Sequence, residues 1–148
     1  MTARTLPPTR TAAEVRIGDS LPEWPVVATP TFVISTALAT RDYQDVHHDR
    51  DAAIARGSQD IFVNILTTTG LTQRYVTDWA GPEALVRNVS IRLGVPCYAY
   101  DTMTFFGQVV DRVTEHGEDR FVLDVLGRTA RGDHVTGTVR IVLPGGVG

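Results

Sequence analysis

The sequence has a single cysteine, Cys97, and therefore cannot form a disulfide within the chain. Structural disulfides belong to oxidising compartments, so a lone cysteine favours a cytoplasmic protein. No apolar run approaches the roughly 20 residues that a membrane-spanning helix needs, and we expect no membrane segment. The formal net charge of −3 is too small to draw the chain toward nucleic acid or an anionic membrane. Internal repeats and low-complexity segments are also absent from the sequence.

What the sequence does contain is an ordinary supply of core-forming residues. Hydrophobic residues make up 43% and charged residues 21% of the 148 residues, as in soluble globular proteins. This length suits one domain with its own core. Residues 1–14 include the pair Pro7-Pro8 and carry no acid before Glu14. We expect a flexible or partner-contacting tail there, and a folded domain over residues 15–148.

Two helices are predicted in the first half of the domain. Residues 49–56 are expected to form a short helix that Gly57 stops. A long helix is expected over residues 62–79, where apolar residues recur at helical spacing. Its middle, residues 67–70, reads Thr-Thr-Thr-Gly and is poor helix-forming material, so the helix must be enclosed by a sheet. The β-branched and aromatic residues 32–34 predict a strand or the lead into a loop.

From residue 89 onward, apolar and polar residues alternate with the period of two that strands require. The odd-numbered residues Met103, Phe105, Val109 and Val113 are expected to share one face. His134 is expected at a strand surface, since it is out of phase with its apolar neighbours. Four strands are expected, over residues 89–95, 103–113, 120–128 and 135–143. A long helix followed by an antiparallel meander predicts a single α+β domain in which the sheet wraps the helix. That is a hot-dog arrangement.

Residues 36–49 concentrate the side chains that carry protons. Three carboxylates and two of the four histidines fall within residues 42–49, directly after an apolar stretch. Asp42 and His47 are five residues apart and can converge across a tight turn. A carboxylate and an imidazole sharing one water form a usable acid–base pair near neutral pH. His48 is expected to point away from this pair.

Simpler roles for the same side chains remain open at this point. Asp42 and Asp49 are of a residue type that commonly caps helices, and two short helices are expected to flank this loop. His47 is also compatible with a buried structural histidine. A metal site built from the histidines and aspartates lacks any wider ligand spacing to support it.

The motif around this pair resembles a known family. Residues 40–49 read Thr-Arg-Asp-Tyr-Gln-Asp-Val-His-His-Asp, which resembles the Ser/Thr-Gly-Asp-x-Asn-Pro-x-His motif of the MaoC-like, R-specific enoyl-CoA hydratases. Residues 96–107 resemble the Pro-x-x-x-Gly-Asp-Thr-Leu-Thr segment with which a strand of that family opens. The resemblance covers about residues 17–143 and implies a hot-dog fold. Residues 37–49 and 75–82 are similar, more narrowly, to the small MaoC-like subunits of actinobacterial steroid side-chain hydratases.

The resemblance implies an enoyl-CoA hydratase that adds water across the 2,3 double bond of a CoA thioester. The implied substrate is a steroid side-chain enoyl-CoA of cholesterol catabolism. Asp42 would orient and deprotonate the water, and His47 would hold it and help to relay the proton. The start of the long helix, near Val63 and Asn64, would bind the thioester oxygen through backbone N–H groups. No cofactor is expected, because the CoA thioester is itself the substrate.

The same resemblance implies a partner chain. We expect a larger MaoC-like subunit with a zinc-ribbon/OB-type extension, joined to this chain in a heterotetramer. A thiolase-like aldolase in the same complex is left open. Three family positions differ here: the family's Gly, Asn and Pro stand as Arg41, Gln44 and Asp45. The His-Gly pair that often opens the family's long helix is Val63-Asn64. These differences fit an altered substrate or an active site split between two chains.

Two other functions fit a hot-dog chain. A hot-dog thioesterase would hydrolyse the thioester, but such enzymes usually carry a carboxylate on the central helix, and residues 62–77 contain no acid. A non-catalytic scaffold subunit would only shape the acyl-CoA pocket of a partner, and the intact Asp42/His47 pair weighs against it.

Overall fold

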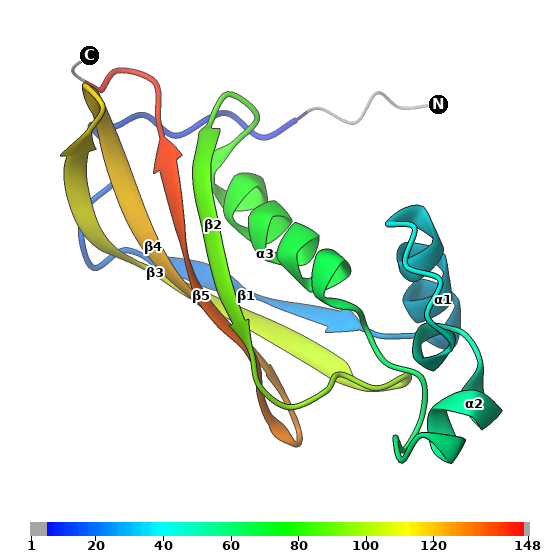
Figure 1. Ribbon diagram of the computed structural model, residues 1–148. Coiled ribbons are helices and arrows are strands. Elements are labelled where there is room, and N and C mark those ends of the chain that lie inside the picture. The colour runs from blue at the N-terminus through cyan, green and yellow to red at the C-terminus, as the bar shows by residue number, and fades with distance from the viewer. Residues whose placement is uncertain (1–5, 147–148) are drawn as a thin grey trace.

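The computed structural model describes residues 6–146, in which an antiparallel sheet curves around one long helix (Figure 1). The sheet has five strands in the order β1-β3-β4-β5-β2. Its strands are β1 (Ser20–Val27), β2 (Leu85–Leu93), β3 (Thr102–Glu115), β4 (Glu118–Thr129) and β5 (Gly132–Val142). The helical elements are α1 (Pro30–Ala39), the 3-10 turn η1 (Asp45–His47), α2 (Arg50–Ala55) and α3 (Ile65–Ala80). The predicted α+β architecture is confirmed.

Helix α3 lies against the concave face of the sheet, and α1 and α2 lie together beyond its N-terminal end (Figure 1). Helix α3 begins at Ile65 and not at the predicted Phe62, because Phe62 forms a β-bridge with Tyr98 and Asn64 caps the helix. The weak helix formers in its middle are enclosed as expected. The side of α3 that faces the sheet is buried and consists of Thr67, Thr68, Leu71, Thr72, Tyr75, Val76 and Ala80.

The prediction of a strand at residues 32–34 is wrong, because these residues lie inside α1. The Thr29 side chain accepts a hydrogen bond from the Phe32 N–H, and Pro30 occupies the first helical position. An N-cap threonine followed by proline is a strong helix-start signal. Here it outweighs the strand preference of the β-branched residues.

Two corrections come from irregular strand pairing. A register shift between Val109 and Asp111 reverses the alternation of β3, so Arg112, not Val113, pairs with the buried Phe121. Val113 therefore does not share the face of Met103, as the alternation had predicted. His134 is also not a surface residue, since its relative exposure is only 2%. A second register shift, between Gly127 and Arg128 on the neighbouring strand, accompanies its burial next to Val135.

The N-terminal segment crosses one end of the sheet. The Arg10 N–H donates to the Ala80 carbonyl, and the Ala12 N–H donates to the Pro144 carbonyl. Ala12 and Val15 are buried. Residues 1–5 of the predicted tail lie outside the described residues, so the boundary at residue 15 stays a prediction. Within residues 6–146, none of the helices combines the length and the apolar character needed to cross a membrane.

Candidate active site

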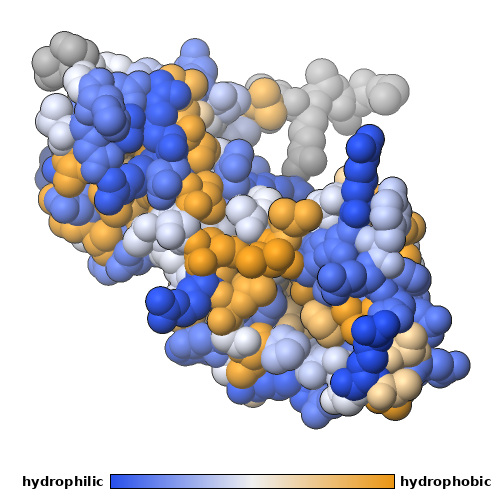
Figure 2. Space-filling view, in the orientation of Figure 1, coloured by the Kyte–Doolittle hydropathy of each residue, from blue (hydrophilic) through white to orange (hydrophobic). Residues whose placement is uncertain are grey.

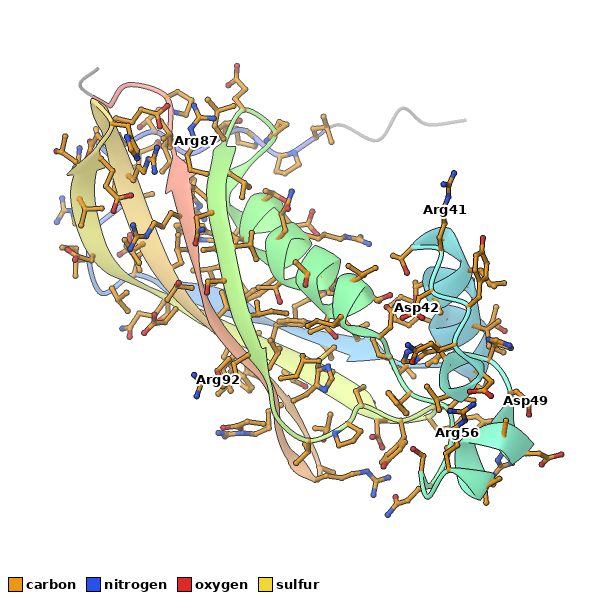
Figure 3. The ribbon with its side chains drawn as sticks, viewed as in Figure 1. Arg41, Asp42, Asp49, Arg56, Arg87 and Arg92 are labelled. Atoms are coloured by element: carbon orange, nitrogen blue, oxygen red, sulfur yellow. The ribbon has the colours of Figure 1, made fainter. Side chains whose placement is uncertain are left out.

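Asp42 and His47 meet where α1 ends. The His47 Nε2 atom lies 3.3 Å from the Asp42 Oδ2 atom. Arg41, which stands where the related motif has glycine, adopts a φ of 57° and turns the chain after α1. Figure 3 shows Asp42 directed toward the start of α3, whereas Arg41 points away from it. The five-residue spacing therefore brings the two predicted catalytic groups together.

The orientation of His47 is fixed by its other ring nitrogen. The Nδ1 atom lies 2.7 Å from the Phe62 carbonyl oxygen, which can only accept, so Nδ1 carries the proton. The Phe62 ring packs edge-on against the imidazole at 4.8 Å. Only 6% of His47 is exposed. In the neutral ring, Nε2 is consequently an acceptor that faces Asp42.

Asp42 is held as a carboxylate by donors on both of its oxygens. Its Oδ2 atom accepts from the Asn64 side-chain amide at 3.0 Å, and its Oδ1 atom accepts from the Gln44 N–H at 3.3 Å. Burial raises the pKa of the Asp42 carboxyl, but the hydrogen bonds from Asn64 and Gln44, with the charge that His47 carries when it is protonated, hold the pKa below its ordinary value. An ionised carboxylate only accepts hydrogen bonds.

A carboxylate oxygen and an imidazole acceptor that face each other can both accept hydrogen bonds from one water molecule. A water molecule can donate one hydrogen to Asp42 and the other to the His47 Nε2 atom, which leaves its lone pairs free. Such a water is both oriented and polarised for attack. The geometry thus supports an acid–base pair working through water.

The pair opens into a cavity of about 430 Å³ at the N-terminal end of α3. The cavity is lined by Asp42, Gln44, His47, residues 62–65, residues 93–96 and His134. His134 is one of the lining residues that the sequence did not predict, because simple alternation places it on the outer face of its strand. Asn64 was expected to contribute its backbone, whereas its side chain proves to be the group that contacts Asp42.

The start of α3 offers backbone donors beside the pair, although not all of those expected. The Val63 N–H donates to the Cys97 carbonyl at 2.9 Å, so this predicted donor is not free for a substrate oxygen. Among the described residues, the N–H groups of Asn64 and Ile65 have no hydrogen-bond partner, and both residues line the cavity. The positive end of the helix dipole and these N–H groups favour a developing negative charge there.

The neighbouring polar residues have other roles. His48 is exposed, as its position next to the buried His47 predicts. The Asp49 carboxylate accepts from the Ala52 N–H at 3.0 Å and caps α2, so the capping interpretation is correct for Asp49. Asp42 caps no helix, because η1 begins with Gln44 as its cap. In residues 6–146, no three His, Cys, Asp or Glu side chains gather closely enough to hold a metal ion.

Comparison with known proteins identifies the family. The chain is 60% identical over 125 residues to the 3-oxo-4,17-pregnadiene-20-carboxyl-CoA hydratase beta subunit of Mycobacterium tuberculosis, and the match covers 84% of this chain and 94% of that subunit. The chain belongs to the MaoC-like hydratase family. No protein-family model matches the chain.

Solved structures agree with this membership. The MaoC-like chain is 58% identical to a chain in the crystal structure of the ChsH1-ChsH2 complex from Mycobacterium tuberculosis, with a TM-score of 0.80 over 86% of this chain and 98% of that one. An (R)-hydratase from A. caviae is 18% identical, with a TM-score of 0.79 over 90% of this chain and 100% of that one. This second likeness concerns the fold alone, and it confirms the hot-dog arrangement.

Proposed function

We propose that this MaoC-like chain is the catalytic subunit of an enoyl-CoA hydratase that acts on a steroid side-chain CoA thioester. The observation that carries the proposal is the Asp42–His47 pair, which faces one cavity together with free N–H groups at the start of α3. The substrate class rests on the relative that is 60% identical, whose name specifies a 3-oxo-4,17-pregnadiene-20-carboxyl-CoA. The proposed reaction needs no bound cofactor.

In the proposed reaction, one water adds across the double bond. Asp42 draws a proton from the water held against His47, one O–H bond breaks, and the oxygen forms a bond to C3. The thioester becomes an enolate, whose oxygen is stabilised by the N–H groups of Asn64 and Ile65. A proton from the pair is then delivered to C2, so that water is consumed and the pair regains its starting state. Both atoms arrive from the face on which Asp42 and His47 lie.

A partner chain is part of the proposal, because the surroundings of the pair are open and apolar. Ile65 and Leu66 are each 52% exposed in the first turn of α3, and Leu93 at the end of β2 is 37% exposed. Figure 2 shows hydrophobic residues gathered near the middle of the face on which α3 begins. A second hot-dog chain covering this surface would exclude water and enlarge the pocket for a steroid.

The finer features of that partner rest on the family resemblance. The ChsH1-ChsH2 structure is a complex of two different subunits, which supports a hetero-oligomer here. We propose a larger MaoC-like partner with a zinc-ribbon/OB-type extension, a heterotetramer, and a thiolase-like aldolase as a further component. A cytoplasmic location accords with Cys97, the one cysteine, being a free and buried thiol.

The two alternatives predicted from the sequence are less well supported. A hot-dog thioesterase usually carries a carboxylate on the central helix, and the single acid on α3, Asp78, lines a different cavity near Trp24 and Trp79. Asp60, just before the helix, pairs with Arg50 instead. A non-catalytic scaffold subunit would not need an acid–base pair, whereas the Asp42 carboxylate and the His47 imidazole are held 3.3 Å apart.

The test uses the chain co-purified with its partner subunit and follows the loss of enoyl-thioester absorbance. Asp42→Asn and His47→Gln should each lower the hydration rate by roughly 10²- to 10⁴-fold. The matched controls are the neighbouring His48→Gln and Asp49→Asn, which should stay near the wild-type rate. Release of free CoA by the wild type would identify a thioesterase. Full activity in the double variant of Asp42 and His47 would identify a scaffold.

A further inference from the structure

A second buried imidazole lines the cavity of the catalytic pair. The His134 Nδ1 atom lies 2.7 Å from the Val95 carbonyl oxygen, and its Nε2 atom lies 2.9 Å from the Thr68 Oγ1 atom. Since the carbonyl only accepts, Nδ1 is the donor, and Nε2 accepts the hydrogen of the Thr68 hydroxyl. Both ring nitrogens are therefore occupied. His134 cannot exchange a proton with substrate without breaking one of these bonds.

These contacts belong to a ring of hydrogen bonds and close contacts, most of whose members line the cavity. On one side, the Thr68 N–H donates to the Asn64 carbonyl at 3.1 Å, and the Asn64 side chain donates to Asp42. Asp42 faces His47, which donates to the Phe62 carbonyl. On the other side, the Val63 N–H donates to Cys97, two residues along the chain from Val95. The Val95–His134–Thr68 link is the segment that closes the ring.

The closing link joins three elements, and its side-chain contacts connect helix α3 to β5. Backbone hydrogen bonds such as that from the Val63 N–H to Cys97 tie the neighbouring segments but do not reach Thr68. Val95 lies in the connection after β2, His134 is the third residue of β5, and Thr68 lies at the end of the first turn of α3. The backbone of His134 adds a further tie, because its carbonyl accepts from the Gly94 N–H at 2.8 Å. Thr68 is fully buried. A hydrogen bond at such a depth is shielded from competing water and is costly to leave unmade.

We propose that His134 and Thr68 are positioning residues that hold the start of α3 against the cavity wall formed by residues 93–96. This inference rests on the proposed hydratase function. The link fixes where the Asn64 and Ile65 N–H groups stand relative to Asp42 and His47. A shift of about 1 Å between the groups that bind the thioester oxygen and those that hold water can cost about 100-fold in rate.

The experiment removes the link, and at Thr68 it does so without a change in side-chain shape. Thr68→Val replaces the hydroxyl by a methyl group of the same shape, and Thr68→Ser keeps the hydroxyl. His134→Asn keeps a donor near the position of Nδ1 and lacks the acceptor for Thr68. In the complex with the partner subunit, Thr68→Val and His134→Asn should each lower kcat about tenfold and leave KM within twofold. Thr68→Ser should stay within threefold of the wild type in kcat.

Non-additivity provides the internal control. Because both substitutions break the same hydrogen bond, the double variant Thr68→Val/His134→Asn should lose about tenfold, not 100-fold, in kcat. Amide hydrogen exchange of residues 64–68 should be faster in each single variant than in the wild type and in Thr68→Ser. This measurement tests the link even if the wild-type complex hydrates no enoyl-CoA, an outcome that would refute the proposed function instead. Wild-type kcat and unchanged exchange in Thr68→Val would overturn the inference, as would an equal loss in Thr68→Ser.

Discussion

The Asn64 side-chain amide donates to the Asp42 Oδ2 atom at 3.0 Å while its own oxygen accepts from the Thr67 N–H at 2.9 Å. The same amide group also donates to the Thr40 Oγ1 atom at 2.9 Å. One side chain thus caps α3, joins it to the end of α1, and holds the catalytic carboxylate. Only 2% of Asn64 is exposed. The departure from glycine at this position is therefore a contribution to the site and not a loss.

Asn64→Asp separates the two roles of this residue. Aspartate keeps the oxygen that caps α3, but it replaces the donor to Asp42 with a negative charge. Both changes raise the pKa of Asp42, since the donor that lowers it is lost and a like charge is added. The acid limb of the kcat/KM profile should therefore move to higher pH, and the rate near neutral pH should fall roughly 10- to 100-fold.

The matched control is Asn64→Ser, which also caps helices but adds no charge. It should retain the stability of the wild type to within about 1 kcal/mol and move the acid limb less than Asn64→Asp does. The measurement is the pH dependence of hydration in the assembled complex, with thermal unfolding recorded in parallel. An acid limb that stays in place in both variants would show that Asn64 does not tune Asp42.

The buried His134 should make the stability of the protein depend on pH. Burial lowers the pKa of His134, against the opposing effects of the hydrogen bond to Val95 and the charge of Asp101. The unfolded chain, with a histidine pKa of about 6.5, binds more protons than the folded chain just below that pH. The free energy of unfolding should thus fall as the pH drops below about 6.5, by at most about 1.4 kcal/mol per pH unit from this residue.

Denaturant unfolding of the wild type and of His134→Asn at pH 7.5 and pH 5.5 checks this slope. The variant is less stable at the higher pH, but it should lose less stability between the two values, because it has no imidazole to protonate. Carboxylates contribute equally to both proteins and cancel in the comparison. Equal losses in the two proteins would show that His134 does not titrate on unfolding.

The alternation of apolar and polar residues and the spacing of the site residues predict much of this fold, and each wrong prediction has a local cause. The alternation after residue 89 is enough to find the last four strands, and the Asp42–His47 spacing is enough to find the pair. Strand bulges cannot be read from alternation, which is why Val113 and His134 were assigned to the wrong faces. The capped start of α1 could have been found, because Thr29-Pro30 is a recognisable helix-start signal.

The hydrogen-bond partners within the site were beyond the reach of sequence. Val63 and Asn64 were both expected to offer backbone donors, yet the Val63 N–H is taken by Cys97, more than thirty positions away along the chain. The Thr68–His134 bond joins residues 66 positions apart. Such pairings depend on how the helix is set onto the sheet, which no local pattern encodes.

Arg41 gives a prediction about backbone strain. Its φ of 57° lies in the left-handed region, where an L-residue with a Cβ atom costs roughly 1–2 kcal/mol. The side chain is exposed and points away from the start of α3 in Figure 3. The Arg41→Gly variant should therefore be more stable than Arg41→Ala, with a free energy of unfolding about 1 kcal/mol higher. In a helix interior the order is the opposite, because glycine is there less stable than alanine. Denaturant unfolding measures the difference, and hydration by Arg41→Gly should stay within about twofold of the wild type. A more stable Arg41→Ala would mean that the turn relaxes without strain.

Tyr75 lies in the other half of α3 and should matter for stability alone. Its hydroxyl donates to the Pro22 carbonyl at 2.9 Å, and its ring stacks on Trp24. It lines a cavity of about 590 Å³ that shares no residue with the cavity of the catalytic pair. Burial, with a smaller effect from Glu23, raises the pKa of Tyr75 to about 12, so the hydroxyl remains a donor throughout the working pH range.

Tyr75→Phe should cost about 1 kcal/mol of stability, because it leaves the Pro22 carbonyl without its partner. Tyr75→Leu, which also loses the stacking, should cost more. Both variants should keep the wild-type kcat and KM in the assembled complex, and a raised KM in Tyr75→Phe would instead place this cavity on the path of the substrate.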